Sequence, residues 1–200
     1  MPSRIGDALY WHATYTPNKT AIVSSLGVQT YAQLWSRVCR LSSALAGLGV
    51  RPGDRIAMLM QNSSRYIEIY QAAALMGIAV VPLNFRFVAS EIEYIVNHAG
   101  ARALFLDASF ADTVGSLRAK LPSIADRYIV TDAAESSAAR SYESLVASGN
   151  DTPPPKPADL SACYFQGYTS GTTSKGLRQS APGVRRLPAP DRDDLRHNGG

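Results

Sequence analysis

A run of hydroxyl residues, glycine and lysine around position 170 is the part of this sequence best suited to chemistry. Hydroxyls and unhindered backbone amides donate hydrogen bonds to phosphate oxygens, Gly171 lets the backbone come close, and Lys175 adds a positive charge. The pattern predicts a phosphate-binding loop, although a polar surface turn without a ligand has the same composition. The candidate residues are Thr169, Ser170, Gly171, Thr172, Thr173 and Lys175.

Spacing excludes three better-known motifs at this loop. A nucleotide-binding P-loop has glycine before its lysine and Ser or Thr after it, whereas Ser174 precedes Lys175 here and Gly176 follows. A hydrolase elbow has the pattern Gly-x-Ser-x-Gly, and Ser170 lies one place too late for it. The Ser-x-x-Lys pattern fails because Thr172 occupies the serine position.

The histidines and cysteines do not indicate a metal or redox site. His12 and His98 lie in segments of helical periodicity without a partner at ligand spacing. Cys39 and Cys163 lie in apolar patterns, so we expect two buried thiols in a reducing compartment. The sequence predicts no metal site and no catalytic residue in this chain.

Composition restricts the class of protein. Apolar residues make up 46% of the 200 residues and charged residues 18%, as in globular domains. The net charge of +4 is scattered, without a basic patch with interleaved aromatic residues, so no nucleic-acid partner is expected. The most apolar stretch, 67–83, contains Glu68 and Pro82 and predicts no membrane span. Because residues 1–7 show no signal-peptide pattern, we expect a cytoplasmic protein.

Helical and strand patterns alternate along the first 150 residues. Helices are expected over 5–15, after a capping box formed by Thr30 and Gln33, and over 63–76, 110–121 and 142–147. A second capping box, Ser90 with Glu93, predicts a helix through His98, where Glu91 and Glu93 complement the helix dipole rather than act as paired acids. Strands are expected over 20–24, 55–60, 79–83, 102–106, 128–131 and 162–166. This order predicts an α/β fold with a mainly parallel sheet flanked by helices.

The sequence changes character after position 176. Residues 177–200 contain no aromatic residue and no helical or strand periodicity, and five of the residues in 178–200 are arginine. Such a segment buries too little apolar surface to offset the entropy of ordering it. We therefore expect one partial domain over 1–176 and an aberrant, disordered tail over 177–200.

Several motifs resemble the acyl-activating, adenylate-forming (AMP-binding) superfamily, which includes acyl-CoA ligases, luciferases and peptide-synthetase adenylation domains. That superfamily carries Thr-Ser-Gly-Thr-Thr-Gly-x-Pro-Lys-Gly, and the loop beginning at Thr169 is similar to it. The segments 30–34, 48–57, 77–84 and 91–101 also resemble its amino-terminal region, in the same order. Among its members, the run Val-Pro-Leu-Asn at 81–84 looks most like a fatty-acyl-CoA ligase.

The resemblance implies a two-step, ATP-dependent reaction. A carboxylic acid substrate attacks the α-phosphate of ATP bound with Mg²⁺, giving an acyl-adenylate and pyrophosphate, and a thiol such as coenzyme A then takes the acyl group. It also implies that residues 169–173 hold the β- and γ-phosphates and that Lys175 matches the lysine of the motif. Relative to the family, two residues are missing between Thr173 and Lys175, which shortens the loop by up to about 7 Å. The family's acyl pocket, magnesium-binding glutamate, ribose-binding aspartate and carboxy-terminal domain have no counterpart here.

Three interpretations of the chain remain open. The first is a truncated acyl-CoA ligase, inactive by itself, whose Arg-rich tail arises from a reading-frame shift near codon 174. The second is a non-catalytic module that binds a nucleotide or pairs with a complementing ligase chain. The third is a defective product, because a parallel-sheet domain cut midway exposes strand edges and apolar surface.

Overall fold

The structure of the chain, a computed structural model, describes residues 5–132, 139–155, 164–169 and 177–180. Its helices are α1 (Ile5–Tyr15), α2 (Tyr31–Gly47), α3 (Ser64–Met76), α4 (Ala89–Ala99), α5 (Ala111–Leu117) and α6 (Tyr142–Ser148). Its strands are β1 (Thr20–Ser24), β2 (Gly27–Thr30), β3 (Arg55–Leu59), β4 (Ala79–Pro82), β5 (Ala103–Leu106), β6 (Tyr128–Val130), β7 (Arg140–Ser141), β8 (Gln166–Thr169) and β9 (Leu177–Ser180).

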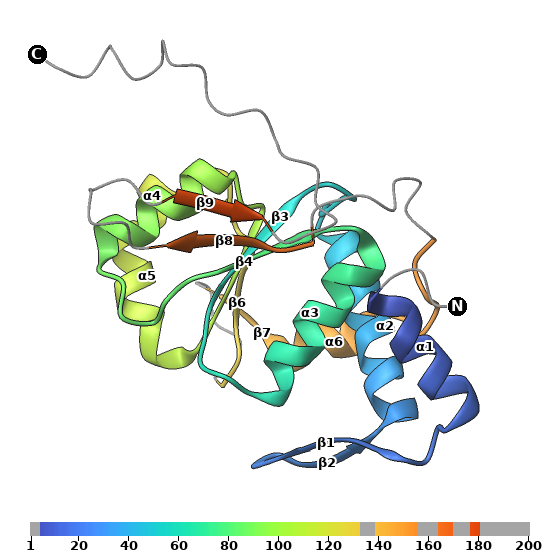
Figure 1. Cartoon of the computed structure of the whole chain (residues 1–200). Coiled ribbons are helices and arrows are strands. Elements are labelled where there is room, and N and C mark those ends of the chain that lie inside the picture. The colour runs from blue at the N-terminus through green and yellow to red at the C-terminus, as the bar shows by residue number, and fades with distance from the viewer. Residues whose placement is uncertain (1–4, 133–138, 156–163, 170–176, 181–200) are drawn as a thin grey trace, which may run out of the picture.

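The centre of the molecule is a parallel sheet with the strand order β4-β3-β5-β6-β7 (Figure 1). The helices α3, α4 and α5 lie in the crossovers that join β3 to β4, β4 to β5 and β5 to β6, the kind of connection that parallel pairing requires. The chain passes from β3 outward to β4 and then returns to β5 on the other side of β3. The order of the sheet therefore reverses between β3 and β5.

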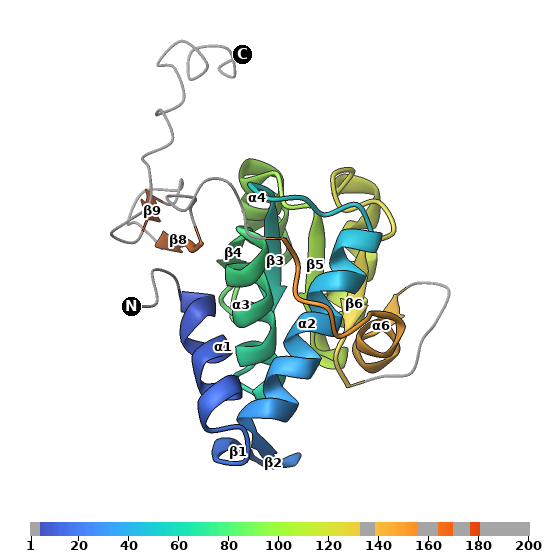
Figure 2. The same ribbon diagram turned by 90° about the vertical axis from the view of Figure 1, so that its right-hand side faces the viewer.

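Helices cover both faces of this sheet. The helices α1, α2, α3 and α6 pack on one face, and α4 and α5 pack on the other (Figure 2). Alternate residues of β3 serve the two cores: Ile56 and Met58 face the first, and Ala57 and Leu59 face the second. Burial on both faces explains why the residues from Ile56 to Leu59 are all apolar instead of alternating with polar residues. The predicted α/β fold with a parallel sheet flanked by helices is confirmed.

The helix α2 forms where its capping residues and periodicity predict it. Thr30 Oγ1 accepts a hydrogen bond from the Gln33 amide at 3.3 Å, and Gln33 Oε1 accepts one from the Thr30 amide at 2.8 Å. Val38, Leu41 and Leu45 on one side of the helix are fully buried. Each such side chain contributes about 1.5–3 kcal/mol to folding by leaving water.

Two helices differ from the sequence-based expectation. The helix α4 begins at Ala89, and Val88 is its N-cap residue. The Val88 amide donates a hydrogen bond to Glu91 Oε2 at 3.0 Å. The predicted Ser90–Glu93 capping box is therefore wrong, and Glu93 pairs instead with Lys120 at 3.3 Å. The helix expected over 110–121 is divided into 3₁₀ turns at Ala108–Phe110 and Arg118–Lys120 with α5 between them.

Three strands were not expected from the sequence, and one of them, β7, pairs parallel with β6 at the edge of the main sheet. β2 pairs antiparallel with β1, outside the main sheet, and leads directly into α2. β9 pairs antiparallel with β8. Leu177–Ser180 thus forms a strand within the segment predicted as a tail, because backbone N–H and C=O groups can pair without any periodicity of the side chains. Residues 181–200 of the predicted tail lie outside the described residues.

Candidate functional site

A hairpin of β8 and β9 frames the predicted phosphate-binding loop. Thr169 is the last residue of β8 and is paired with Leu177, the first residue of β9. The two ends of the loop therefore lie on adjacent strands. The other predicted site residues, Ser170, Gly171, Thr172, Thr173 and Lys175, lie outside the described part of the chain.

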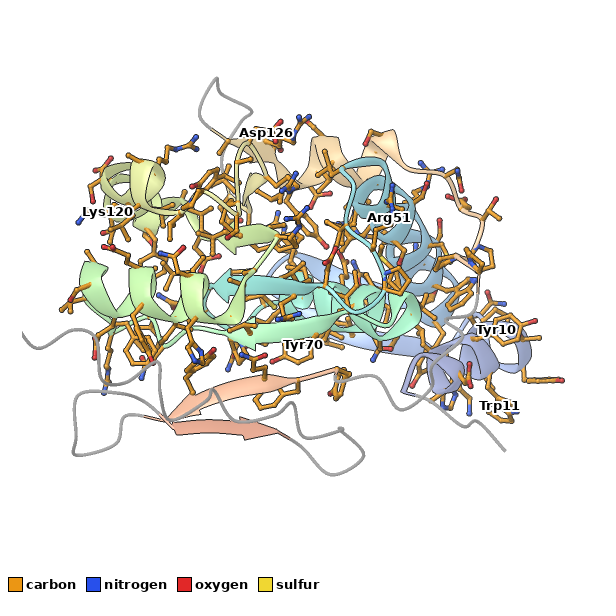
Figure 3. The ribbon with its side chains drawn as sticks, turned by 90° about the horizontal axis from the view of Figure 1, so that it is seen from above. Tyr10, Trp11, Arg51, Tyr70, Lys120 and Asp126 are labelled. Atoms are coloured by element: carbon orange, nitrogen blue, oxygen red, sulfur yellow. The ribbon has the colours of Figure 1, made fainter. Side chains whose placement is uncertain are left out.

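The hairpin lies beside β4, the edge strand of the main sheet (Figure 3). The Val80 amide donates to the Tyr164 carbonyl at 2.9 Å, and Val80 forms an isolated parallel bridge with Phe165. Tyr70 of α3 lies on the same side, with its ring 6.2 Å from that of Tyr164. The two residues that precede β8, Tyr164 and Phe165, therefore pair with the edge of the parallel sheet at a single bridge.

Pro82 limits this extension. The amides of Ala79 and Leu83 donate toward β3, so the amides of even-numbered residues in β4 face the opposite side, where Val80 meets Tyr164. Pro82 is the next position on that side and has no N–H group to donate. The next backbone hydrogen bond from β4 toward the segment that leads into β8 therefore cannot be donated by β4.

Side chains connect β8 to α4 instead. His98 Nδ1 and Tyr168 Oη are 2.8 Å apart, and Gln166 Nε2 donates to the same Oη at 2.7 Å. The ring of Tyr168 meets the edge of His98 at a centroid distance of 5.7 Å, and His98 stacks on Tyr94 at 5.4 Å. An open pocket of about 590 Å³ lined by Ser90, Glu93, Tyr94, Asn97 and His98 borders this contact.

A second polar cluster lies at the carboxyl ends of the central strands, where ligands bind in many open α/β sheets. Asp107 follows β5; its Oδ2 accepts from the Gln61 amide at 2.7 Å and its Oδ1 accepts from Thr131 Oγ1 at 2.7 Å. These bonds tie together the ends of β3, β5 and β6. Because both carboxylate oxygens are engaged within the chain, we assign Asp107 a structural role.

The largest ionic network lies among α2, α3 and α6. Arg37 donates from Nε to Glu68 Oε1 at 2.8 Å and from its terminal nitrogens to Glu143 at 2.9 and 3.1 Å. Glu68 is fully buried and also accepts from Gln29 at 2.9 Å and from Tyr142 at 2.7 Å. Partial burial opposes ionisation of Glu143, but its bonds to Arg37 and Arg65 outweigh burial and lower the pKa of this carboxyl. Every oxygen of Glu68 has a donor, so the network joins helices rather than offering a ligand site.

Other residues considered from the sequence have structural partners. His12 stacks on Tyr31 at 4.5 Å and lies 3.4 Å from Thr16 Oγ1. Within the described residues no group of three or more His, Cys, Asp or Glu side chains is placed to hold a metal ion. No helix in the described ranges has the length and apolar character needed to cross a membrane.

Comparison with known proteins identifies the family. Residues 9–176 match the family of AMP-binding enzymes. The chain belongs to this family. The match ends at position 176, at the close of the predicted loop, so it includes all six candidate residues.

Curated relatives of the chain are acyl-activating ligases. A fatty acid–[acyl-carrier-protein] ligase of Streptomyces coeruleorubidus is 35% identical over 165 residues, covering 82% of this chain and 30% of the relative. A long-chain-fatty-acid–CoA ligase of Thermus thermophilus is 35% identical over 144 residues, covering 72% of this chain and 26% of the relative. The chain thus spans about 30% of the length of such relatives.

Solved structures agree with the family. The inhibitor-bound N-terminal domain of FACL13 from Mycobacterium tuberculosis has a TM-score of 0.77 at 29% identity, covering 88% of this chain and 44% of that one. The anthranilate CoA ligase AuaEII has a TM-score of 0.83 at 23% identity over 90% of this chain, a likeness in fold alone. The predicted resemblance to an amino-terminal portion of an adenylate-forming ligase is confirmed.

Sequence reasoning missed the residues that attach the loop to the body of the protein. His98 lies in a predicted helix without a partner at ligand spacing, and Tyr168 is not among the six candidate residues. The signal available was the position of Tyr168, two residues after Gln166 and on the same face of an extended strand. Nothing local connects that face to His98, which lies 70 positions earlier.

Proposed function

We propose that this chain supplies the nucleotide phosphate-binding portion of an ATP-dependent, carboxylate-activating ligase. The observation that carries the proposal is the AMP-binding enzyme match over residues 9–176, with the motif resembling the family's phosphate-binding signature set between two paired strands. In the proposed reaction the carboxylate oxygen attacks the α-phosphate of ATP and pyrophosphate leaves. A thiol then attacks the acyl carbon and releases AMP. The ATP requirement and the buried free thiol of Cys39 favour the cytoplasm as the compartment.

The candidate loop residues have separate roles in this proposal. Hydroxyls and amides of residues 169–173 donate to the β- and γ-phosphates, and Lys175 offsets part of their negative charge. Hydrogen bonds to a charged group contribute about 1.5–3 kcal/mol each. In the family reaction ATP would enter with Mg²⁺, which would neutralise part of the phosphate charge, and the acyl acceptor would be coenzyme A or another thiol.

Nucleotide binding is tested by thermal unfolding and calorimetry with Mg-ATP. We expect saturable binding that weakens at least tenfold in Lys175→Ala, because a charge beside the phosphates is lost. The matched control is Lys120→Ala, since Lys120 pairs with Glu93 on the surface and should leave binding unchanged. Equal binding by the two variants would contradict the assignment of Lys175, and no binding by the parent chain would contradict the proposed function.

We further propose that the 200-residue chain by itself neither adenylates a carboxylic acid nor forms acyl-CoA. It spans about 30% of the length of its relatives, so most of a ligase of their size lies beyond the matched region. Acyl-dependent exchange of pyrophosphate into ATP, measured with a panel of fatty and aromatic acids, should stay at background. Exchange above background that disappears in Lys175→Ala would refute this.

A non-catalytic module that pairs with a complementing ligase chain is the second candidate. Within the described residues, helices pack on both faces of the main sheet. These covered faces favour a chain that folds as a unit and pairs with another chain. The test is to mix the chain with an acyl-CoA ligase from which the corresponding amino-terminal segment has been deleted. Acyl-CoA formation only on mixing would support pairing, and none at any ratio would argue against it.

A further inference from the structure

The contact between His98 and Tyr168 is the principal described link between the β8–β9 hairpin and α4. Along the edge of the main sheet, Val80 donates to Tyr164, but Pro82 cannot provide the next backbone bond. The chain therefore reaches the loop without further support from the β4 amides on that side. The side-chain contact of Tyr168 with His98 therefore adds a link between the residue before Thr169 and α4 that these amides do not provide.

Tyr168 is suited to this task. Its Oη accepts a hydrogen bond from Gln166 Nε2 at 2.7 Å, and it lies 2.8 Å from His98 Nδ1, to which its hydroxyl donates when the imidazole carries its proton on Nε2. The imidazole is itself held by stacking on Tyr94 at 5.4 Å. The resulting series, Gln166 to Tyr168 to His98, joins a strand of the hairpin to a helix packed on the main sheet.

We propose that His98 and Tyr168 are positioning residues for the phosphate-binding loop. Tyr168 directly precedes Thr169, the first candidate residue of the loop, so a shift of the Tyr168 ring moves the start of the loop with it. Misplacement of a binding group by 1 Å can cost about a hundredfold in a reaction that depends on its geometry. The inference rests on the proposed nucleotide binding, which it extends to two residues outside the family motif.

The test uses the full chain and two separate readouts. Tyr168→Phe keeps the ring and removes the hydroxyl that joins both partners. His98→Phe removes the acceptor but keeps a ring beside Tyr94, whereas His98→Asn keeps a polar atom near the position of Nδ1. Tyr94→Phe is the control, because it preserves stacking on His98 and leaves the Tyr168 hydroxyl in place.

The first readout is amide hydrogen exchange of residues 166–169 and 177–180, with the β5 amides as an internal reference for global unfolding. We expect about tenfold faster exchange of the hairpin in Tyr168→Phe and His98→Phe, unchanged exchange in β5, and rates near the parent in His98→Asn and Tyr94→Phe. The second readout is Mg-ATP affinity, which should fall in the same two variants and recover in His98→Asn.

The outcomes separate this inference from the proposed function. Unchanged hairpin exchange in Tyr168→Phe overturns the inference, whatever happens to nucleotide binding. Faster exchange with unchanged Mg-ATP affinity also overturns it, since the anchor would then not position the loop. If the parent binds no Mg-ATP, the proposed function fails, and exchange alone decides whether these residues fix the hairpin to α4.

Discussion

Tyr142 donates its hydroxyl hydrogen to Glu68 Oε2 across 2.7 Å, and both side chains are fully buried. A buried carboxylate is costly unless all of its oxygens are paired, and here Arg37 and Gln29 supply the other donors. The residues come from β2, α2, α3 and α6, so one ionic group joins four elements on the same face of the sheet. Burial and the neighbouring Glu68 carboxylate raise the pKa of Tyr142 well above its usual value and keep it a donor.

Replacing Tyr142 with phenylalanine should destabilise the fold. The variant keeps the ring in the core but removes one donor from a buried carboxylate, at a cost of about 1.5–3 kcal/mol. Urea unfolding measures the change, and Tyr15→Phe is the control because Tyr15 is 68% exposed. A loss below about 0.5 kcal/mol would mean that water or another donor replaces the hydroxyl.

Glu143 should make stability depend on pH in the acid range. Its pKa in the folded chain lies below the ordinary value of 4.5, because Arg37 and Arg65 favour the ionised form against partial burial. The contribution of ionised Glu143 to the free energy of unfolding is therefore complete above the unfolded-state pKa. It is lost as the pH falls through the folded-state pKa. Glu143→Gln should be less stable than the parent at pH 7, and the difference should shrink below about pH 4.5. Unfolding from pH 3 to 7 checks this, with Glu93→Gln as the surface control; a constant difference across the range would contradict it.

Cys39 should be unreactive in the native chain. Burial, assisted by the charge of Asp151, raises the pKa of its thiol to about 11, and the side chain is fully buried. At pH 8 only about one thiol in a thousand would be ionised even with free access. Mass spectrometry after iodoacetamide treatment should find Cys39 unmodified in buffer and alkylated in denaturant. Rapid native alkylation would show that α2 opens readily.

The sequence predicted the elements whose signals are local. The capping residues Thr30 and Gln33 identified the start of α2, and the fully apolar stretch around Ile56 and Met58 indicated a strand buried on both faces. The cap of α4 was misplaced because Ser90 and Glu93 fit a capping pattern, whereas Val88 has no side-chain acceptor and only the Glu91 half of the box forms.

The contacts that hold the candidate site against the rest of the protein could not be predicted from local sequence patterns. His98 and Tyr168 are brought together by the packing of β8 near α4, which depends on the whole sheet. Likewise Glu68 was visible only as a charge within an apolar stretch, and its partners Arg37 and Tyr142 lie 31 and 74 positions away. Strand β9 was missed because its pairing with β8 uses backbone groups, which leave no signature in composition.

Gly149 offers the sharpest test of the packing between α6 and α2. A Cβ atom at this position would lie 1.9 Å from the carbonyl oxygen of Arg40 and 2.7 Å from its carbonyl carbon, both part of the helix backbone. The backbone cannot move aside as a flexible side chain would, so Gly149→Ala must separate α6 from α2. That separation also strains the ion pair between Arg40 and Asp151, two residues further along.

We therefore expect Gly149→Ala to lower stability by about 2–4 kcal/mol, in the range of severe overpacking. Gly115→Ala is the matched control: it lies within α5, nothing is within 4 Å of the added Cβ, and alanine favours a helix over glycine by about 1 kcal/mol. The two substitutions add the same methyl group and should shift the urea midpoint in opposite directions. Equal shifts would show that backbone entropy, rather than close approach to Arg40, determines the effect at position 149.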